Sequence, residues 1–275
     1  MRAASTKGVT VTVHDLGGSG DPFLIAHATG ICGRAYEPMA GALKDAFHVY
    51  ALDFRGHGDS TDPEDGDFAW GGMGDDVLAA IATLGVDQID VFGHSLGGAA
   101  LLIAEGMRPG LLRSAYFFEP IVMTEEYLTG RTNLMSDAAR RRREVFPSRA
   151  DALMRYASRT PLGVWRADAL AAYVEHGFED LPDGTVRLKC RPESEARTFE
   201  CETKMTLERI EGFAVPTVVA VGSEEPTGAM FGQPIVDVMA NARLAQYPHL
   251  GHFGPLQDPA SIGADVLEAA TSIRA

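Results

Sequence analysis

The feature that most constrains this fold is a serine between two glycines, where a short apolar run changes into an alanine-rich stretch. Ile89–Phe92 predicts a buried strand, and Gly97–Ala104 predicts a helix that packs closely on its neighbours. A strand that becomes a helix within a few residues needs a tight turn, and the flanking glycines omit Cβ atoms where the two elements nearly touch. The turn projects the Ser95 side chain away from the sheet and places the N–H of Leu96 at a helix N-terminus.

Other apolar runs alternate with helical patterns along the chain. Strands are predicted at Val9–Val13, Phe23–Ala26, Val49–Leu52, Ala115–Phe118, Pro216–Val221 and Arg243–Tyr247. Helices are predicted at Asp75–Leu84 and Asp258–Ile273, and an amphipathic stretch lies near Ala35–Phe47. Continuous apolar strands that alternate with helices predict the α/β class, with a mostly parallel, doubly wound sheet. Ligands of such sheets bind outside the carboxyl ends of the strands.

The pattern changes between residues 123 and 212, where apolar strand runs give way to amphipathic helical stretches such as Ala150–Ser158 and Ala167–Glu175. We therefore predict a core of residues 1–122 and 213–275, with a mostly helical lid inserted at 123–212.

Three local features of this insertion carry predictions of their own. Ser148 is a candidate N-cap, because Asp151 follows three residues later. Residues near Leu181–Arg197 look like a loop, with a turn at Pro182-Asp183-Gly184. We expect the basic run Arg140–Arg143 to form a solvated helix face.

Composition narrows the class of partner. The net charge is −14, which disfavours nucleic acid and anionic membranes and leaves a small molecule as the expected partner. The chain has no apolar stretch of transmembrane length, and Met1–Gly8 is polar, so we expect a cytoplasmic protein. The three cysteines match no metal-ligand spacing. We expect no cofactor and no metal, and the sequence leaves homo-oligomer formation open.

Four motifs resemble those of the α/β-hydrolase superfamily, in the order in which that superfamily carries them. They are His27-Ala28-Thr29-Gly30, Asp53-Phe54-Arg55-Gly56-His57-Gly58-Asp59-Ser60, Gly93-His94-Ser95-Leu96-Gly97-Gly98 and Gly251-His252-Phe253. The resemblance covers nearly the whole chain and implies the α/β-hydrolase fold. It says little about the substrate.

A serine hydroxyl is a weak nucleophile at neutral pH and needs a base that a third group orients. By the resemblance, Ser95 is the nucleophile and His252 the base, whereas His249 is expected at the surface. Two positions could supply the acid. Glu225 follows a strand at the position more usual for the superfamily, and Glu119 ends the apolar strand Ala115–Phe118. We favour Glu119, because a carboxylate that ends a buried run needs a partner and some relatives carry their acid there.

The resemblance also suggests the remaining site residues. The N–H groups of Thr29 and Leu96 would stabilise the oxyanion, although Ala28 stands where glycine is common. Ile31, Trp165 and Phe253 are candidates to line the substrate pocket, and Tyr173 is a weaker one.

These residues predict a serine hydrolase that cleaves an ester or lactone of a small, fairly apolar molecule. A carbon–carbon bond hydrolase and a cofactor-free perhydrolase would use the same triad. A ligand-binding protein or receptor on the same fold, without turnover, is the alternative from another class. Serine at position 95 disfavours epoxide and alkyl-halide chemistry, since most such relatives use aspartate there.

Overall fold

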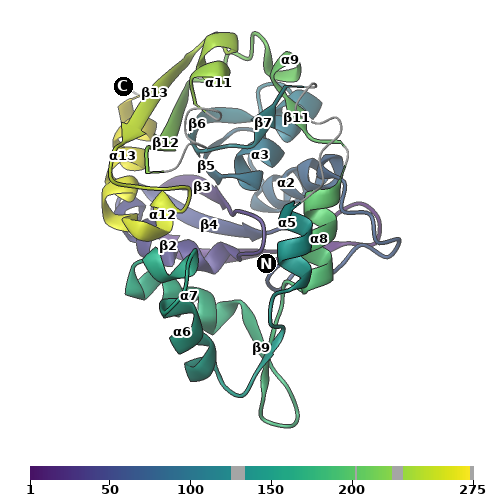
Figure 1. The fold of residues 1–275 in the computed structure, drawn as a ribbon. Coiled ribbons are helices and arrows are strands. Elements are labelled where there is room, and N and C mark those ends of the chain that lie inside the picture. The colour runs from purple at the N-terminus through teal and green to yellow at the C-terminus, as the bar shows by residue number, and fades with distance from the viewer. Residues whose placement is uncertain (125–133, 202, 225–231, 273–275) are drawn as a thin grey trace.

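An eight-stranded sheet runs through the computed structural model, which describes residues 1–124, 134–201, 203–224 and 232–272 (Figure 1). The strand order is β1-β2-β4-β3-β5-β6-β12-β13. The strands are β1 (Arg2–Ala4), β2 (Thr10–Gly18), β3 (Asp21–Ala26), β4 (Phe47–Asp53), β5 (Ile89–His94), β6 (Leu112–Phe118), β12 (Thr217–Gly222) and β13 (Ala242–Tyr247). β2 pairs antiparallel with β1 and β4, and all other neighbours are parallel. The mostly parallel sheet is confirmed.

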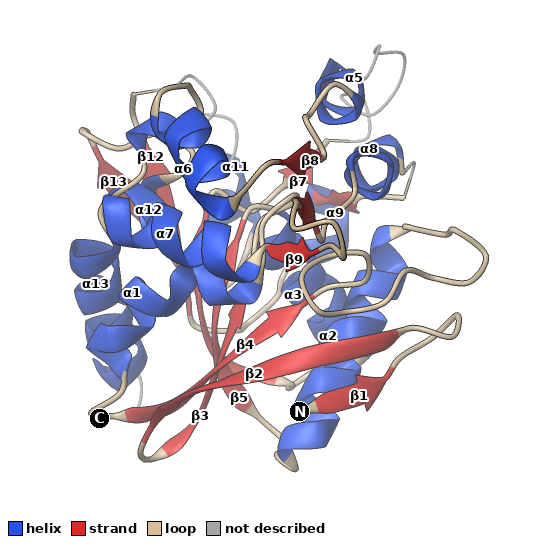
Figure 2. Cartoon of the chain, turned by 90° about the horizontal axis from the view of Figure 1, so that it is seen from below, coloured by secondary structure: helices blue, strands red, loops and turns tan. Residues whose placement is uncertain are grey.

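Helices cover both faces of this sheet (Figure 2). One face carries α1 (Glu37–Ala40), α12 (Gly254–Gln257) and α13 (Pro259–Ser272), and the other carries α2 (Trp70–Leu84), α3 (Leu96–Met107) and α11 (Gln233–Val238). Successive residues of a strand pack on opposite faces of the sheet. In β3, Phe23 and Ile25 pack with α1, α12 and α13, whereas Leu24 and Ala26 pack with α2, α3 and α11. Burial on both faces explains why these strands read as continuous apolar runs.

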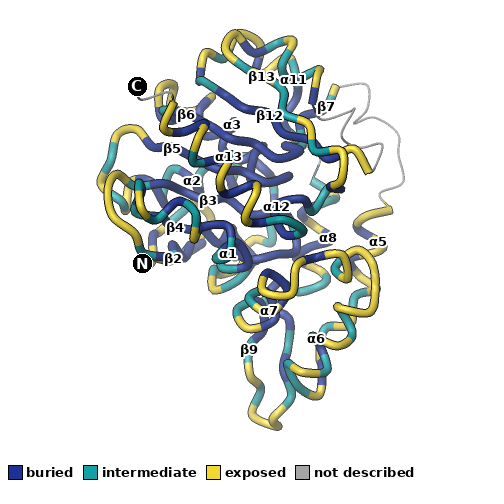
Figure 3. The backbone as a smooth tube through the Cα atoms, turned by 90° about the vertical axis from the view of Figure 1, so that its left-hand side faces the viewer, coloured by how far each residue is buried: buried dark blue, intermediate teal, exposed yellow. Residues whose placement is uncertain are grey.

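Residues 134–201 and 203–212 contain both helices and short strands. The helices are α5 (Leu134–Arg140), α6 (Arg149–Ala157), α7 (Ala167–His176), α8 (Pro192–Glu200) and α9 (Leu207–Ile210), with a 3₁₀ turn η3 (Leu162–Val164). The strands are β8 (Val145–Phe146), β9 (Phe178–Asp180) and β10 (Val186–Leu188), which form an antiparallel sheet, and β11 (Met205–Thr206), which pairs with β7 (Val122–Met123). Figure 3 shows α6, α7 and β9 projecting from the core.

Two details of this segment differ from the expectation. The stretch Leu181–Arg197 is not simply a loop, because it contains β10 and most of α8. β10 exists through its pairing with β8 and β9, which a local pattern does not reveal. α8 begins with Pro192 and has two glutamates in its first turn, both of which favour a helix start. The N-cap prediction is confirmed: the Ser148 hydroxyl accepts a hydrogen bond from the backbone N–H of Asp151.

The amphipathic stretch near Ala35–Phe47 is three short turns rather than one helix. It consists of η1 (Gly33–Tyr36), α1 and η2 (Gly41–Leu43), and strand β4 begins at Phe47. Pro38 lies in the first turn of α1, where its missing N–H prevents continuation of the preceding turn. Within the described residues, no helix is both long enough and apolar enough to cross a bilayer.

Candidate active site

The turn after β5 is the sharpest feature at the carboxyl edge of the sheet. Ser95 has φ 55° and ψ −117°, and α3 begins at the next residue. Its N–H donates to the carbonyl of Phe118 at the end of β6 (3.0 Å). A Cβ on Gly97 would lie 2.2 Å from the carbonyl oxygen of Ala26, so only glycine fits this close approach of α3 to β3. The backbone thus holds Ser95 in a strained conformation beside the ends of β3 and β6.

Glu119 directly follows β6 and is fully buried. Its carboxylate accepts a hydrogen bond from Nδ1 of His252 (2.6 Å) and another from the N–H of Gly222 (3.0 Å). A carboxylate accepts this bond, so Nδ1 of His252 is the donor, and Nε2 is the ring nitrogen that remains to take up a proton. The structure therefore brings together two of the three predicted triad side chains, the base His252 and the acid Glu119. Glu225, the other candidate acid, lies outside the described residues.

Three loops of the predicted site follow parallel strands at one edge of the sheet. Thr29 comes after β3, Ser95 after β5 and Glu119 after β6. β5 pairs with both β3 and β6, with Gly93 opposite Ala26 and His94 opposite Phe118. The alignment of the strand ends therefore sets the three loops side by side, as expected for ligand sites of parallel sheets.

The two predicted oxyanion donors are Leu96, at the start of α3, and Thr29, in the loop after β3. The Ser95 carbonyl accepts from the N–H groups of Gly98 (3.1 Å) and Ala99 (3.3 Å), so the ladder of α3 begins with these residues. The N–H of Leu96 precedes them at the helix N-terminus, which favours negative charge. Thr29 is half-buried in the loop after β3.

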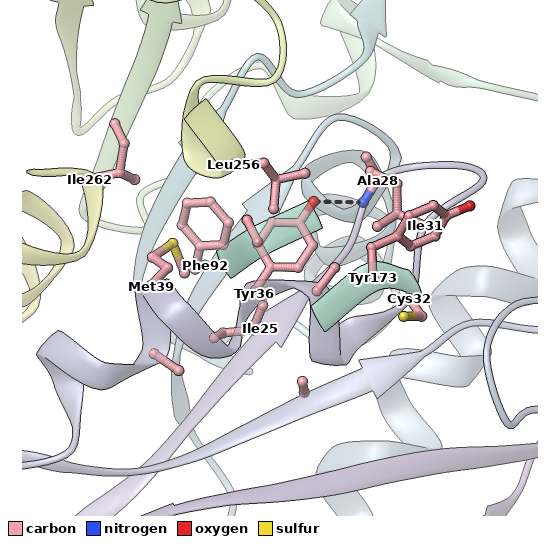
Figure 4. Packing of buried hydrophobic residues seen from close by; sticks show 14 of the residues in the cluster. Ile25, Ala28, Ile31, Cys32, Tyr36, Met39, Phe92, Tyr173, Leu256 and Ile262 are labelled. Atoms are coloured by element: carbon pink, nitrogen blue, oxygen red, sulfur yellow. Dashed lines mark hydrogen bonds between the residues drawn. The ribbon is translucent and has the colours of Figure 1, made fainter. Parts of the chain in front are cut away.

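The candidate residues for the substrate pocket lie in or against one core cluster. Trp165 is buried, and its ring centroid lies 5.4 Å from that of half-buried Phe253, which in turn is 5.4 Å from His252. Phe253 therefore adjoins the imidazole, and Trp165 packs on Phe253. Ile31 is buried in the same core cluster as Trp165 and Tyr173, and Figure 4 includes Ile31 and Tyr173 in this packing.

A polar network that the sequence pattern does not reveal connects the Thr29 loop to residues between 142 and 195. The Tyr173 hydroxyl donates to the carbonyl of Gly30 (3.0 Å) and accepts from Arg142 (2.8 Å), which also pairs with Glu195. The expectation of a solvated Arg140–Arg143 face is therefore wrong for Arg142, because α5 ends at Arg140 and the next turn directs Arg142 inward. Nothing in a run of four arginines indicates which of them is inward.

One cluster of described residues has ligand atoms close enough to hold a metal ion: His14, Asp53 and Asp59, within 4.8 Å of one another. Protein groups already occupy those atoms. His14 binds Asp53 through Nε2 (2.7 Å), and Lys189 binds Asp59 (2.6 Å). The Lys189 ammonium at this position would compete with a bound cation.

Comparison with known proteins supports this architecture. The model of the alpha/beta hydrolase family matches residues 11–264. A solved structure of E-2-(acetamidomethylene)succinate hydrolase superposes with a TM-score of 0.82 at 22% identity, over 100% of this chain and 98% of that one. These matches confirm the predicted α/β-hydrolase fold.

Two curated relatives are similar over part of the sequence. 2-(Acetamidomethylene)succinate hydrolase of Mesorhizobium japonicum is 32% identical over 162 residues, which is 50% of this chain and 58% of the relative. (E)-2-((N-methylformamido)methylene)succinate hydrolase of Acinetobacter baylyi is 30% identical over 100 residues, 35% of this chain and 36% of the relative. The matched region thus spans less than two thirds of either relative.

Proposed function

Since this chain belongs to the alpha/beta hydrolase family, we propose that it is a serine hydrolase that cleaves an ester or lactone of a small, fairly apolar molecule. The observation that carries the proposal is the hydrogen bond between Glu119 and His252, at the sheet edge where the strained turn presents Ser95. A buried carboxylate that orients an imidazole is the arrangement that activates a serine hydroxyl as a nucleophile.

The proposed reaction runs through an acyl-enzyme. Oγ of Ser95 forms a bond to the substrate carbonyl carbon as its proton passes to Nε2 of His252, and Glu119 stabilises the resulting imidazolium. The N–H groups of Leu96 and Thr29 bind the oxyanion. Collapse breaks the bond to the leaving oxygen, which takes the proton from His252. Water then attacks the acyl carbon as its proton passes to Nε2 of His252. The bond between the acyl carbon and Oγ of Ser95 breaks, Oγ takes the proton back from His252, and the carboxylic acid is released.

The inserted segment would cover the bound substrate as a lid. Trp165 supports this role, because it belongs to that segment and packs on Phe253, next to the proposed base. The apolar faces of Trp165, Phe253 and Ile31 suit a small apolar acyl or alkyl group.

The relatives favour a second candidate, the hydrolysis of an amide-type bond in a small carboxylic acid. Both curated relatives are named for succinates that carry an N-acylaminomethylene group. The same nucleophile, base and oxyanion donors would serve either bond, and only the leaving group would change. The binding-protein alternative is an outcome of the labelling test below, and a carbon–carbon hydrolase or a perhydrolase would use the same triad.

Labelling with a fluorophosphonate probe, followed by peptide mapping, tests the nucleophile. We expect modification of Ser95 and its loss in Ser95→Ala, whereas Ser261→Ala, which changes an exposed serine of α13, should label like the wild type. Absence of labelling at Ser95 would favour the binding protein. Turnover of p-nitrophenyl acetate compared with an N-acylaminomethylene succinate then separates the ester and amide candidates.

A pair of variants tests the acid. Glu119→Gln should lower kcat by roughly 10³- to 10⁴-fold, because a glutamine amide donor facing Nδ1 would favour the wrong imidazole tautomer. Glu225→Gln should keep near wild-type turnover. If Glu225→Gln alone loses turnover, the assignment of Glu119 is wrong.

A further inference from the structure

A chain of buried hydrogen bonds runs behind the proposed site and involves two side chains that the proposed reaction does not use. The backbone N–H of Ala28 donates to the hydroxyl of Tyr36 (3.3 Å), and this hydroxyl lies 2.6 Å from Nδ1 of His94. On its other side, Nε2 of His94 lies 2.8 Å from the carbonyl oxygen of His252. Figure 4 shows the Tyr36 ring directed at the Ala28 backbone. Tyr36 and His94 are both fully buried.

The donor and acceptor of every bond in this series follow from its two terminal groups, the His252 carbonyl and the Ala28 N–H. The His252 carbonyl can only accept, so Nε2 of His94 carries the proton. Burial lowers the pKa of His94 well below its usual range, so the ring is neutral and Nδ1 is an acceptor. The Tyr36 hydroxyl therefore donates to Nδ1, which leaves its oxygen lone pairs to receive the N–H of Ala28. No other arrangement of protons satisfies both contacts of the neutral His94 ring together with the bond from Ala28 to Tyr36.

These hydrogen bonds reach three of the segments that the proposed mechanism uses. Ala28 precedes the oxyanion donor Thr29, His94 precedes Ser95, and the His252 carbonyl belongs to the proposed base itself. A shift of either end would move the Thr29 N–H or the His252 ring relative to Ser95. Displacements of about 1 Å in such groups can cost about 100-fold in rate.

We propose that Tyr36 and His94 are positioning residues that hold the oxyanion loop and the base loop in register around Ser95. This inference rests on the proposed serine-hydrolase function. Its physical basis is that neither residue supplies a reacting atom in the proposed mechanism, yet each gives one donor and one acceptor to the hydrogen bonds that join the two loops. Preorganised donors stabilise the transition state more than the bound substrate. The series of hydrogen bonds therefore contributes to kcat rather than to substrate binding.

Tyr36→Phe removes the hydroxyl and keeps the ring. We expect kcat for p-nitrophenyl acetate to fall 10- to 100-fold with KM within twofold, and Ki for phenylboronic acid, which mimics the tetrahedral adduct, to rise at least 10-fold. The matched control is Tyr116→Phe, which also removes a buried tyrosine hydroxyl, here one that bonds to Tyr247 (2.6 Å). It should leave kcat and Ki unchanged. Equal kcat and Ki in Tyr36→Phe and the wild type would overturn the proposal.

Two substitutions of His94 test the positioning role if Tyr36→Phe does not fold. His94→Gln keeps one donor and one acceptor, whereas His94→Leu has neither, so the Gln variant should retain at least 10-fold more kcat. Equal kcat in folded Gln and Leu variants would contradict the positioning role. Fluorophosphonate labelling of wild-type Ser95 is the independent check: without it the proposed function fails, whatever the variants show.

Discussion

Acid should destabilise this protein in a pH range where its carboxylates are still largely ionised, because His27 is buried in its neutral form. Nδ1 of His27 donates to the carbonyl of Ala28 (2.8 Å), and Nε2 accepts from the N–H of Phe54 (3.1 Å). A second proton would break the bond to Phe54. Burial, with nearby His57 as a smaller cause, lowers the pKa of His27 to about 3 from an ordinary 6.5.

The sign and size of the effect follow from proton linkage. Above pH 6.5 the ring is neutral in both folded and unfolded chains, so the full stability is present. Below that pH the unfolded chain takes up a proton that the folded chain refuses, and the free energy of unfolding falls until the pH approaches 3. At pH 5 the two pKa values give a loss of about 2 kcal/mol for His27 alone. Burial also lowers the pKa values of His57 and His94, which act in the same direction.

Urea unfolding at pH 8 and pH 5 measures this loss. His27→Gln should be less stable than the wild type at pH 8, because the new side chain fits the two bonds less well. Its further loss between pH 8 and pH 5 should be smaller than that of the wild type by about 2 kcal/mol. His249→Gln, at an exposed histidine, should lose as much as the wild type. The reasoning is refuted if His27→Gln and the wild type lose the same free energy over this range.

Three further substitutions test other parts of the fold. Asp76→Asn should cost about 3–5 kcal/mol in urea unfolding, since it leaves the buried guanidinium of Arg55 without its ion-pair partner (2.8 Å); a loss below about 1 kcal/mol would contradict this. Ser148→Ala should lower stability by about 1 kcal/mol, measured as a fall in Tm, by removing the N-cap of α6; an unchanged Tm would contradict a stabilising cap. Gly97→Ala should abolish labelling of Ser95 and lower Tm, because its Cβ would meet Ala26 at 2.2 Å; normal labelling would show that α3 can shift freely.

Much of the core could be predicted from sequence because its signals are local. A strand buried on both faces tends to be a continuous apolar run, and β3, β6 and β12 each contain one. In β5 the run is shorter, because buried Asp90 interrupts it and leaves Val91 and Phe92. Strands that form only through pairing with other segments show no such continuous apolar run. β1 has only three residues and exists through pairing with β2. β10 likewise depends on β8 and β9, so its local pattern predicts a loop.

The same distinction separates the predicted site residues from those that were missed. Ser95 could be singled out by its immediate neighbours, and the loops after strands are where ligands of parallel sheets bind. Tyr36 could not be recognised, because its partner His94 is 58 positions away and His94 in turn bonds to a residue 158 positions further on. Arg142 was misassigned for the same reason: its partner Tyr173 lies on α7, 31 residues later.

Backbone strain supplies an argument for the proposed triad that does not depend on family resemblance. Among the described residues, three that are not glycine have positive φ: Lys7, Ser95 and Glu119. Such conformations cost of order 1–3 kcal/mol each and persist where the surroundings impose them. Neighbouring strand ends impose two of them, because the Ser95 N–H bonds to Phe118 (3.0 Å) and the Glu119 N–H bonds to Ala220 (2.8 Å). The fold thus keeps strain at the proposed nucleophile and the proposed acid, where a relaxed backbone would direct both side chains elsewhere.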